Sequence, residues 1–137
     1  MYHEIYGRIE RSDYNILNAP GDFSEFTRAA NELEVTQMSE GRTIEGYSKV
    51  IELRVSAFKI GKTRELALII SKDYYNLGNF YLNLKEPQNA FDSYINSLKY
   101  YNYVLGLSRT DEKYKYSNSF VAYKIGQVYH SIGDINN

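Results

Sequence analysis

The sequence has no cysteine and no apolar run long enough to span a bilayer. Without cysteine the chain forms no disulfide, offers no thiolate nucleophile and cannot build a cysteine-ligated zinc site. Its N-terminus, MYHEIYGRIERSDY, carries scattered charges and lacks the apolar core of a secretory signal. We therefore expect a cytoplasmic protein with no membrane partner.

An excess of charge of one sign is also missing. Among 137 residues, 16 lysines and arginines face 17 acidic residues, and the formal net charge is −1. Such a chain has no overall electrostatic attraction to a phosphate backbone, so nucleic acid is not an expected partner. The length corresponds to about one domain, which can bury a core without staples.

Residues that could support catalysis are few. The two histidines, His3 and His130, are expected at opposite ends of the molecule, which argues against a metal site or a Ser-His-Asp arrangement. Asp111 and Glu112 lie at the start of a predicted helix, where they complement its dipole. The glycines are isolated, and none follows a predicted strand as in a phosphate-binding loop. We expect no enzyme, no catalytic residue, no metal and no cofactor.

The segment 74–98 has the pattern of two helices joined by a turn. Residues at steps of three and four form one stripe on each helix. Pro87 lies between the stripes and is favoured as the first residue of a helix, where its missing N–H loses no partner. The stripes consist of Tyr74, Leu77, Gly78 and Tyr81, then Ala90, Tyr94 and Ser97.

This pattern recurs along the chain with a period of 47 to 48 residues. The shift is 48 between Gly78 and Gly126 (126 minus 78) and 47 between Thr43 and Ala90 (90 minus 43). The turns at 61–63 and 108–110 agree with the shift of 47, and each ends in a threonine that can cap the next helix. The other matched residues are Leu77 with Ile125, Tyr81 with Tyr129, Tyr47 with Tyr94, Val50 with Ser97 and Ile51 with Leu98.

The order Leu77-Gly78, Tyr81, Ala90, Tyr94, Ser97-Leu98 resembles the tetratricopeptide repeat (TPR). The resemblance implies an all-α fold in which antiparallel helix pairs stack as a right-handed α-solenoid. The usual period of that family is about 34 residues, so this chain is similar to its long-helix members. We expect one domain with four parts: an N-terminal helix and loop (1–21), a divergent repeat (22–60), the best-matching repeat (63–107) and a partial repeat (110–137).

Within this organisation the predicted helices lie near 23–36, 42–60, 63–84, 87–107 and 110–132. Asp22 and Glu25 form a capping box for the first of them, which we expect to pair with 42–60. A turn is expected at Gly133-Asp134. A short helix is also expected before residue 11, from the helical spacing of Tyr2, Ile5, Tyr6 and Ile9.

Packing explains the recurring residues. Gly78 and Ala90 leave room for a close approach of two helices, and Leu77 fills space around it. Most tyrosines are then expected to be core residues, among them Tyr74, Tyr81, Tyr94 and Tyr129.

The resemblance implies that the first helix of each repeat lines a concave groove with the face turned away from the second helix. Aromatic rings next to amides can bury ligand area and pair with a peptide backbone. Alternatively, another helix covers these residues, or they are only solvated polar positions. The predicted peptide-binding residues are Lys72, Tyr75, Asn79, Asn83, Tyr123, Gln127 and His130, with Leu82, Phe120 and Ser131 on the same faces.

One subgroup of the family grips a C-terminal carboxylate with lysine and asparagine side chains. Asn79 matches that pattern, but Tyr75 and Lys124 occupy positions where lysine and asparagine are expected. We therefore expect no such clamp, so a free carboxyl end should not improve the binding of a peptide.

The function that these features favour is a protein or peptide interaction module that acts as an adaptor or scaffold. The alternative is a ligand- or peptide-sensing regulatory domain of a larger bacterial regulator. Because the last repeat stops where its second helix should follow, we expect a fragment in which Ile125 and Tyr129 are partly uncovered. These two residues are predicted to mediate self-association, most simply as a two-fold dimer.

Overall fold

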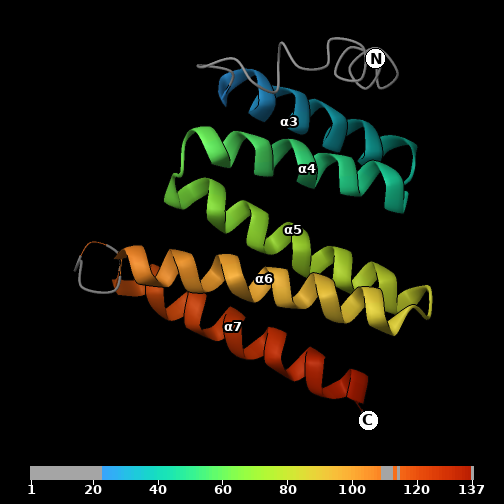
Figure 1. The fold of residues 1–137 in the computed structure, drawn as a ribbon, viewed down its shortest axis with the longest axis vertical. Coiled ribbons are helices and arrows are strands. Elements are labelled where there is room, and N and C mark those ends of the chain that lie inside the picture. The colour runs from blue at the N-terminus through green and yellow to red at the C-terminus, as the bar shows by residue number, and fades with distance from the viewer. Residues whose placement is uncertain (1–22, 109–112, 114, 137) are drawn as a thin grey trace. The chain divides into compact units, whose positions relative to one another are not determined.

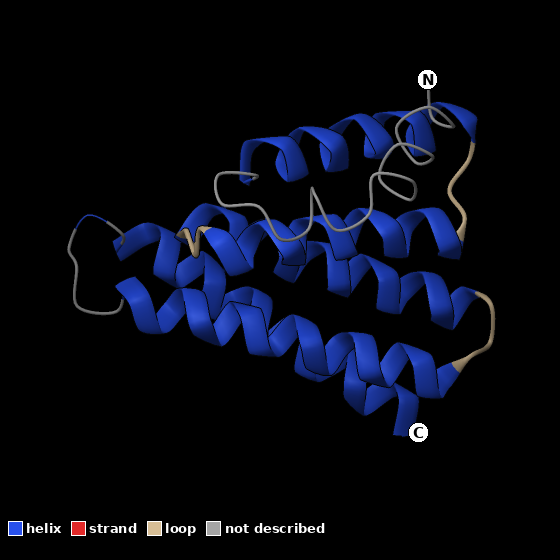
Figure 2. Ribbon diagram, turned by 45° about the horizontal axis from the view of Figure 1, so that its top comes forward, coloured by secondary structure: helices blue, strands red, loops and turns tan. Residues whose placement is uncertain are grey.

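The computed structural model describes residues 23–108, 113 and 115–136. In these ranges the chain forms helices joined by loops, with no strand, which confirms the all-α prediction (Figure 2). The predicted N-terminal helix, Asp22, His3 and the pair Asp111 and Glu112 lie outside the described residues. In chain order the helices are α3 (Phe23–Glu40), α4 (Ile44–Ile60), α5 (Arg64–Asn83), α6 (Pro87–Ser108) and α7 (Lys115–Asn136) (Figure 1).

The chain divides into two compact units, the first ending at Thr63 and the second beginning at Arg64. In the first unit α3 packs against α4, as the sequence predicts. Ala29 and Ala30 are fully buried and allow the two helices to approach closely. The larger core residues of this unit are Phe26, Leu33, Tyr47, Val50, Ile51, Leu53 and Phe58.

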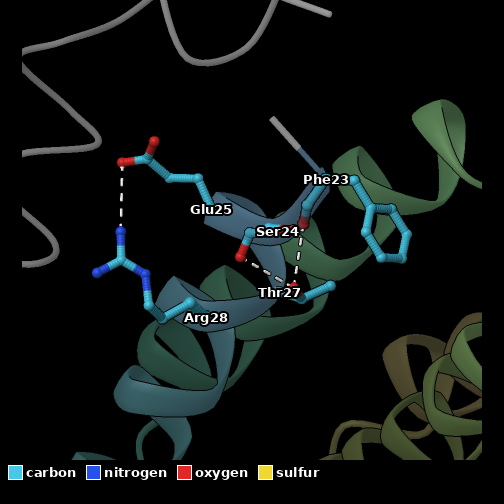
Figure 3. Close-up of polar contacts among 5 residues, drawn as sticks. All are labelled: Phe23, Ser24, Glu25, Thr27 and Arg28. Atoms are coloured by element: carbon cyan, nitrogen blue, oxygen red, sulfur yellow. Dashed lines mark hydrogen bonds and ion pairs between the residues drawn. The ribbon is translucent and has the colours of Figure 1, made fainter. Parts of the chain in front are cut away.

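The start of α3 is held by local side-chain contacts (Figure 3). The hydroxyl of Thr27 lies 3.1 Å from the carbonyl oxygen of Phe23 and 3.0 Å from that of Ser24, so its proton can be donated to either. The carboxylate of Glu25 lies 3.7 Å from the guanidinium of Arg28 one turn later.

The turn between α3 and α4 depends on Gly41, whose φ of 102° lies in the left-handed region that favours glycine. The Gly41 N–H donates to the carbonyl of Gln37 at 3.0 Å. Thr43 then caps α4, because its hydroxyl accepts the N–H of Gly46 at 3.0 Å. The buried Gln37 side chain completes the turn by accepting the Thr43 N–H at 3.0 Å.

One charged side chain, Arg54, is buried between α3 and α4. Its Nη2 donates to Glu34 Oε1 at 2.8 Å and to Asn31 Oδ1 at 3.0 Å. The guanidinium is thus paired and hydrogen-bonded, as a buried charge must be.

In the second unit α5 and α6 form an antiparallel pair with a close contact at Gly78. A Cβ atom built on Gly78 would lie only 2.5 to 2.9 Å from ring atoms of Tyr94, which is fully buried. A second small pair lies along the same helices, where the Ser97 hydroxyl donates to the Ser71 carbonyl at 2.8 Å. These contacts agree with the predicted reason for small residues at this interface.

The turn after α5 is a Schellman motif that prepares the start of α6. The N–H of Glu86 donates to the Tyr81 carbonyl and the N–H of Lys85 donates to that of Leu82, both at 2.9 Å. Lys85 has a φ of 60°. Pro87 then begins α6, as predicted.

Helix α7 packs on α6 and differs from prediction at its end. The turn expected at Gly133-Asp134 is wrong, since the helix continues to Asn136. Helical continuation places Asp134 one turn after His130, with 3.7 Å between Oδ2 and Nε2, and places Ile135 near Phe91 in the lining of one pocket. Glycine costs only about 1 kcal/mol inside a helix, so Gly133 alone does not end α7.

The predicted core tyrosines differ in their outcomes. Tyr94 is fully buried, whereas Tyr74 and Tyr81 are half-buried. Tyr129 is 59% exposed, so its assignment to the core is wrong and its expected uncovering is confirmed. Ile125 is partly exposed.

The repeat of 47 residues reappears in the burial of α4 and α6. Both residues are buried in the matched pairs Tyr47 and Tyr94, Val50 and Ser97, and Ile51 and Leu98, and in two further pairs at the same shift, Arg54 and Tyr101, and Ala57 and Val104. The matched pair Thr43 and Ala90 differs, because Thr43 is exposed and Ala90 is buried. The shift of 48 does not carry burial from α5 to α7, because Gly78 is buried whereas Gly126 is exposed.

Candidate binding face on α5 and α7

Helices α5 and α7 run in the same direction, opposite to α6 (Figure 1). Side chains of the two helices meet at several points. Arg64 Nη2 donates to Ser117 Oγ at 2.6 Å. The Tyr75 hydroxyl lies 3.3 Å from Ser131 Oγ. We define the α5–α7 face by Arg64, Lys72 and Tyr75 of α5 and by Ser117, Phe120, Lys124 and Ser131 of α7.

The centre of this face is the Phe120 ring, which is 44% exposed. Lys72 Nζ lies 5.8 Å from the ring centroid and Lys124 Nζ lies 5.4 Å from it. Both distances are within the range of cation–π attraction. Lys124 Nζ also donates to Gln127 Oε1 at 3.3 Å, whereas neither lysine forms an ion pair with a described carboxylate.

A polar cluster ties the α5–α7 face to α6. The Tyr94 hydroxyl donates to Asn79 Oδ1 at 2.5 Å, and the rings of Tyr75 and Tyr94 lie 5.5 Å apart. Burial raises the pKa of Tyr94 to about 12; the nearby Tyr75 adds to this rise and a hydrogen bond with Ser131 opposes it. The cluster stabilises the neutral phenol and so helps to hold the three helices in register.

Tyr75 and Asn79 were predicted on the side of α5 that faces away from the second helix. Their contacts with Tyr94 of α6 show that this placement is wrong for both. The two residues are half-buried. Their side chains contribute to the support of the face.

Of the other predicted binding residues, only some lie close to one another. Lys72 is exposed and reaches Phe120, which brings the predicted faces of α5 and α7 together. Tyr123 is 64% exposed, and Asn83 is exposed at the end of α5. His130 is exposed beside Asp134, and Gln127 is half-buried beside Lys124.

Lys124, Arg64 and Ser117 were not predicted as members of the site. A pattern in the sequence could have indicated the first of them, because Phe120 and Lys124 are four residues apart and share a helix face. The internal shift of 48 also aligns Lys72 with Phe120 (120 minus 72). Contacts such as Arg64 with Ser117 depend on how the helices pack and had no comparable pattern.

Away from the α5–α7 face, a pocket of about 450 Å³ lies between the start of α6 and the end of α7. Its lining combines apolar groups of Pro87, Phe91 and Ile135 with the amide of Gln88. In the ranges that the structure describes, no group of three or more acidic or histidine side chains is arranged to hold a metal ion. None of the described helices combines the length and apolar character needed to cross a bilayer.

Comparison of the chain with protein-family models, with curated proteins and with solved structures gives no match. The chemistry of the α5–α7 face is therefore the basis for assigning a function.

Proposed function

We propose that this protein is an interaction module that binds a protein or peptide partner on its α5–α7 face. The proposal depends chiefly on one observation: the Phe120 ring is exposed and lies beside two lysines that have no described carboxylate partner. Aromatic side chains provide large contact areas in interfaces. The lysines supply hydrogen-bond donors beside it.

The side-chain contacts that support the α5–α7 face make it suitable for binding a partner. The hydrogen bond between Tyr94 and Asn79 and the contact between Tyr75 and Ser131 connect three helices. A surface on packed helices changes little when a ligand binds, which limits the entropy lost in binding. The partner would therefore meet a preformed site.

We also propose that the helix pairs are TPR-like repeats stacked in a right-handed solenoid. The antiparallel pairs of helices, the buried positions that recur at 47 residues and the contact of Gly78 with Tyr94 support this proposal. An adaptor or scaffold role would follow from such an architecture.

A selection with random peptides tests the binding face. Short peptides are displayed as fusions through their C-termini and selected for binding to the wild-type protein at low salt. The enriched sequences are then synthesised with amidated C-termini. We expect binding to Phe120→Ser to be at least about tenfold weaker than binding to the wild type in fluorescence anisotropy. Circular dichroism checks that the variant keeps its helices.

Ile95→Ser is the matched control, because Ile95 of α6 is also 44% exposed. It should leave the affinity unchanged. If no peptide is enriched, or if the two variants weaken binding equally, the α5–α7 face is not the binding site.

A further inference from the structure

We infer that the partner segment recognised by the α5–α7 face is acidic, with side-chain carboxylates close to an apolar residue. This inference rests on the proposed function and specifies the chemistry of its partner. Two ammonium groups near one exposed ring define the arrangement. An apolar side chain would cover Phe120 while carboxylates approach Lys72 and Lys124.

Charge complementarity is the argument for an acidic occupant. Lys72 and Lys124 come from different helices, yet both lie beside Phe120, so their like charges repel one another there. No described carboxylate pairs with either lysine. A carboxylate from a partner would relieve this repulsion and form a charge-assisted hydrogen bond.

The acidic side chains of the same two helices do not neutralise this part of the face. Asp73 follows Lys72 but is buried. Glu65 is exposed two turns before Lys72, and Asp134 lies beside His130 near the end of α7. The cationic character around Phe120 therefore persists although the whole chain has a net charge of −1.

Side-chain carboxylates fit this arrangement better than a chain terminus. The two lysines come from different helices and both lie beside the ring. An internal segment can offer a separate carboxylate to each lysine and an apolar group to Phe120, whereas a chain end offers a single terminal carboxylate. Asn79 Oδ1 accepts from Tyr94 and the Tyr75 hydroxyl contacts Ser131, so both side chains belong to the cluster that supports the face.

The composition of the selected peptides tests the inference. We expect amidated peptides enriched on the wild type to contain aspartate or glutamate next to an apolar residue. Replacement of these acids by their amides should weaken binding at least about tenfold, and raising the salt concentration should weaken the acidic peptides more than their amide forms. For the double variant Lys72→Gln/Lys124→Gln, the affinities for the acidic peptides and for their amide forms should differ far less.

Lys85→Gln/Lys99→Gln is the control, because it removes the same charge from exposed lysines elsewhere in the second unit. It should retain the preference for acidic peptides. Enriched peptides that are neutral or basic but depend on Phe120 would overturn the acidic chemistry and leave the binding face standing. A preference lost equally in both double variants would show only a general charge effect and would also overturn the inference.

Discussion

At the scale of single residues, Gly78 is the position where α5 and α6 tolerate the least change. The Tyr94 ring occupies the space that a side chain would need, and this ring is fully buried and hydrogen-bonded to Asn79. We expect Gly78→Leu to lower the free energy of unfolding by about 1–3 kcal/mol or more through overpacking. Urea denaturation followed by circular dichroism measures the change.

Gly126 provides the matched control for Gly78, since the internal repeat aligns the two glycines. A Cβ atom on Gly126 would have nothing within 4 Å. Gly126→Ala should therefore raise the free energy of unfolding by about 0.5–1 kcal/mol, as expected for alanine in an exposed helix interior. An unchanged stability of Gly78→Leu would show that the pairing of α5 with α6 is wrong.

The buried phenol of Tyr101 should make stability depend on pH in the alkaline range. Burial raises the pKa of Tyr101 from 10.0 to about 12, with the nearby Tyr75 adding to the rise. The unfolded chain then loses this proton near pH 10 while the folded chain retains it, so folding becomes less favourable as pH rises from 10 to 12. Each pH unit in this window lowers the free energy of unfolding by about 1.4 kcal/mol for this group.

Tyr101→Phe removes one titrating hydroxyl and should reduce the slope of the stability profile between pH 10 and 12. The pKa of Tyr94 is also raised to about 12, so part of the slope should remain. Urea denaturation across the alkaline range measures the profile. Tyr123→Phe is the control, because it removes a hydroxyl from a side chain that is 64% exposed. A Tyr101→Phe variant with the slope of the parent would contradict the assignment of this phenol.

At the scale of elements, the turn between α5 and α6 contains a residue in an unfavourable conformation. Lys85 has a φ of 60°, which is costly for a residue with a Cβ atom. Lys85→Gly should relieve that strain and raise the free energy of unfolding by up to about 1 kcal/mol, less the extra entropy of glycine in the unfolded chain. Thermal unfolding checks the sign.

Gly41→Ala tests the same argument in reverse at the turn between α3 and α4. Gly41 has a φ of 102°, which is a strained conformation for alanine, although the space around this position is open. The free energy of unfolding of the Gly41→Ala variant should fall by about 1 kcal/mol.

If Lys85→Gly destabilises the protein instead of stabilising it, the Schellman geometry of the turn between α5 and α6 is wrong.

The helices could be predicted from the sequence because their causes are local. Pro87 and the stripes at steps of three and four mark a helix start and the buried faces directly. The end of α7 was missed because glycine costs only about 1 kcal/mol inside a helix, which is too little to end this helix at Gly133.

The candidate site could be predicted only in part, since it depends on how three helices pack. Lys72 and Phe120 were placed on the groove faces of successive repeats, and in the structure Lys72 Nζ lies 5.8 Å from the centroid of the Phe120 ring. The repeat could not show that Tyr75 and Asn79 contact Tyr94 of α6. One face of a helix is broad, so the spacing of residues alone does not decide whether a side chain points toward the second helix or away from it. The same limit applies to Arg64, which finds Ser117 across 53 residues.

At the scale of the whole molecule, α7 presents a second surface that no described helix covers. Ala122, Gly126, Tyr129 and Gly133 follow one another at steps of four, three and four, and all are exposed. The small residues permit a close approach of a second helix, and Tyr129 projects between them. In a two-fold arrangement each tyrosine would meet the small residues of the other copy.

We therefore expect the protein to self-associate through this surface of α7. Light scattering at several concentrations should show a mass that rises with concentration for the parent, and Tyr129→Lys should abolish the rise while circular dichroism shows unchanged helicity. Tyr123→Lys is the matched control, because it places the same charge on an exposed tyrosine at 64% exposure against 59%, on a different side of the helix. A parent that stays monomeric at every concentration contradicts the dimer. An equal loss in both variants would mean that the contact is not on the side of α7 that carries Tyr129.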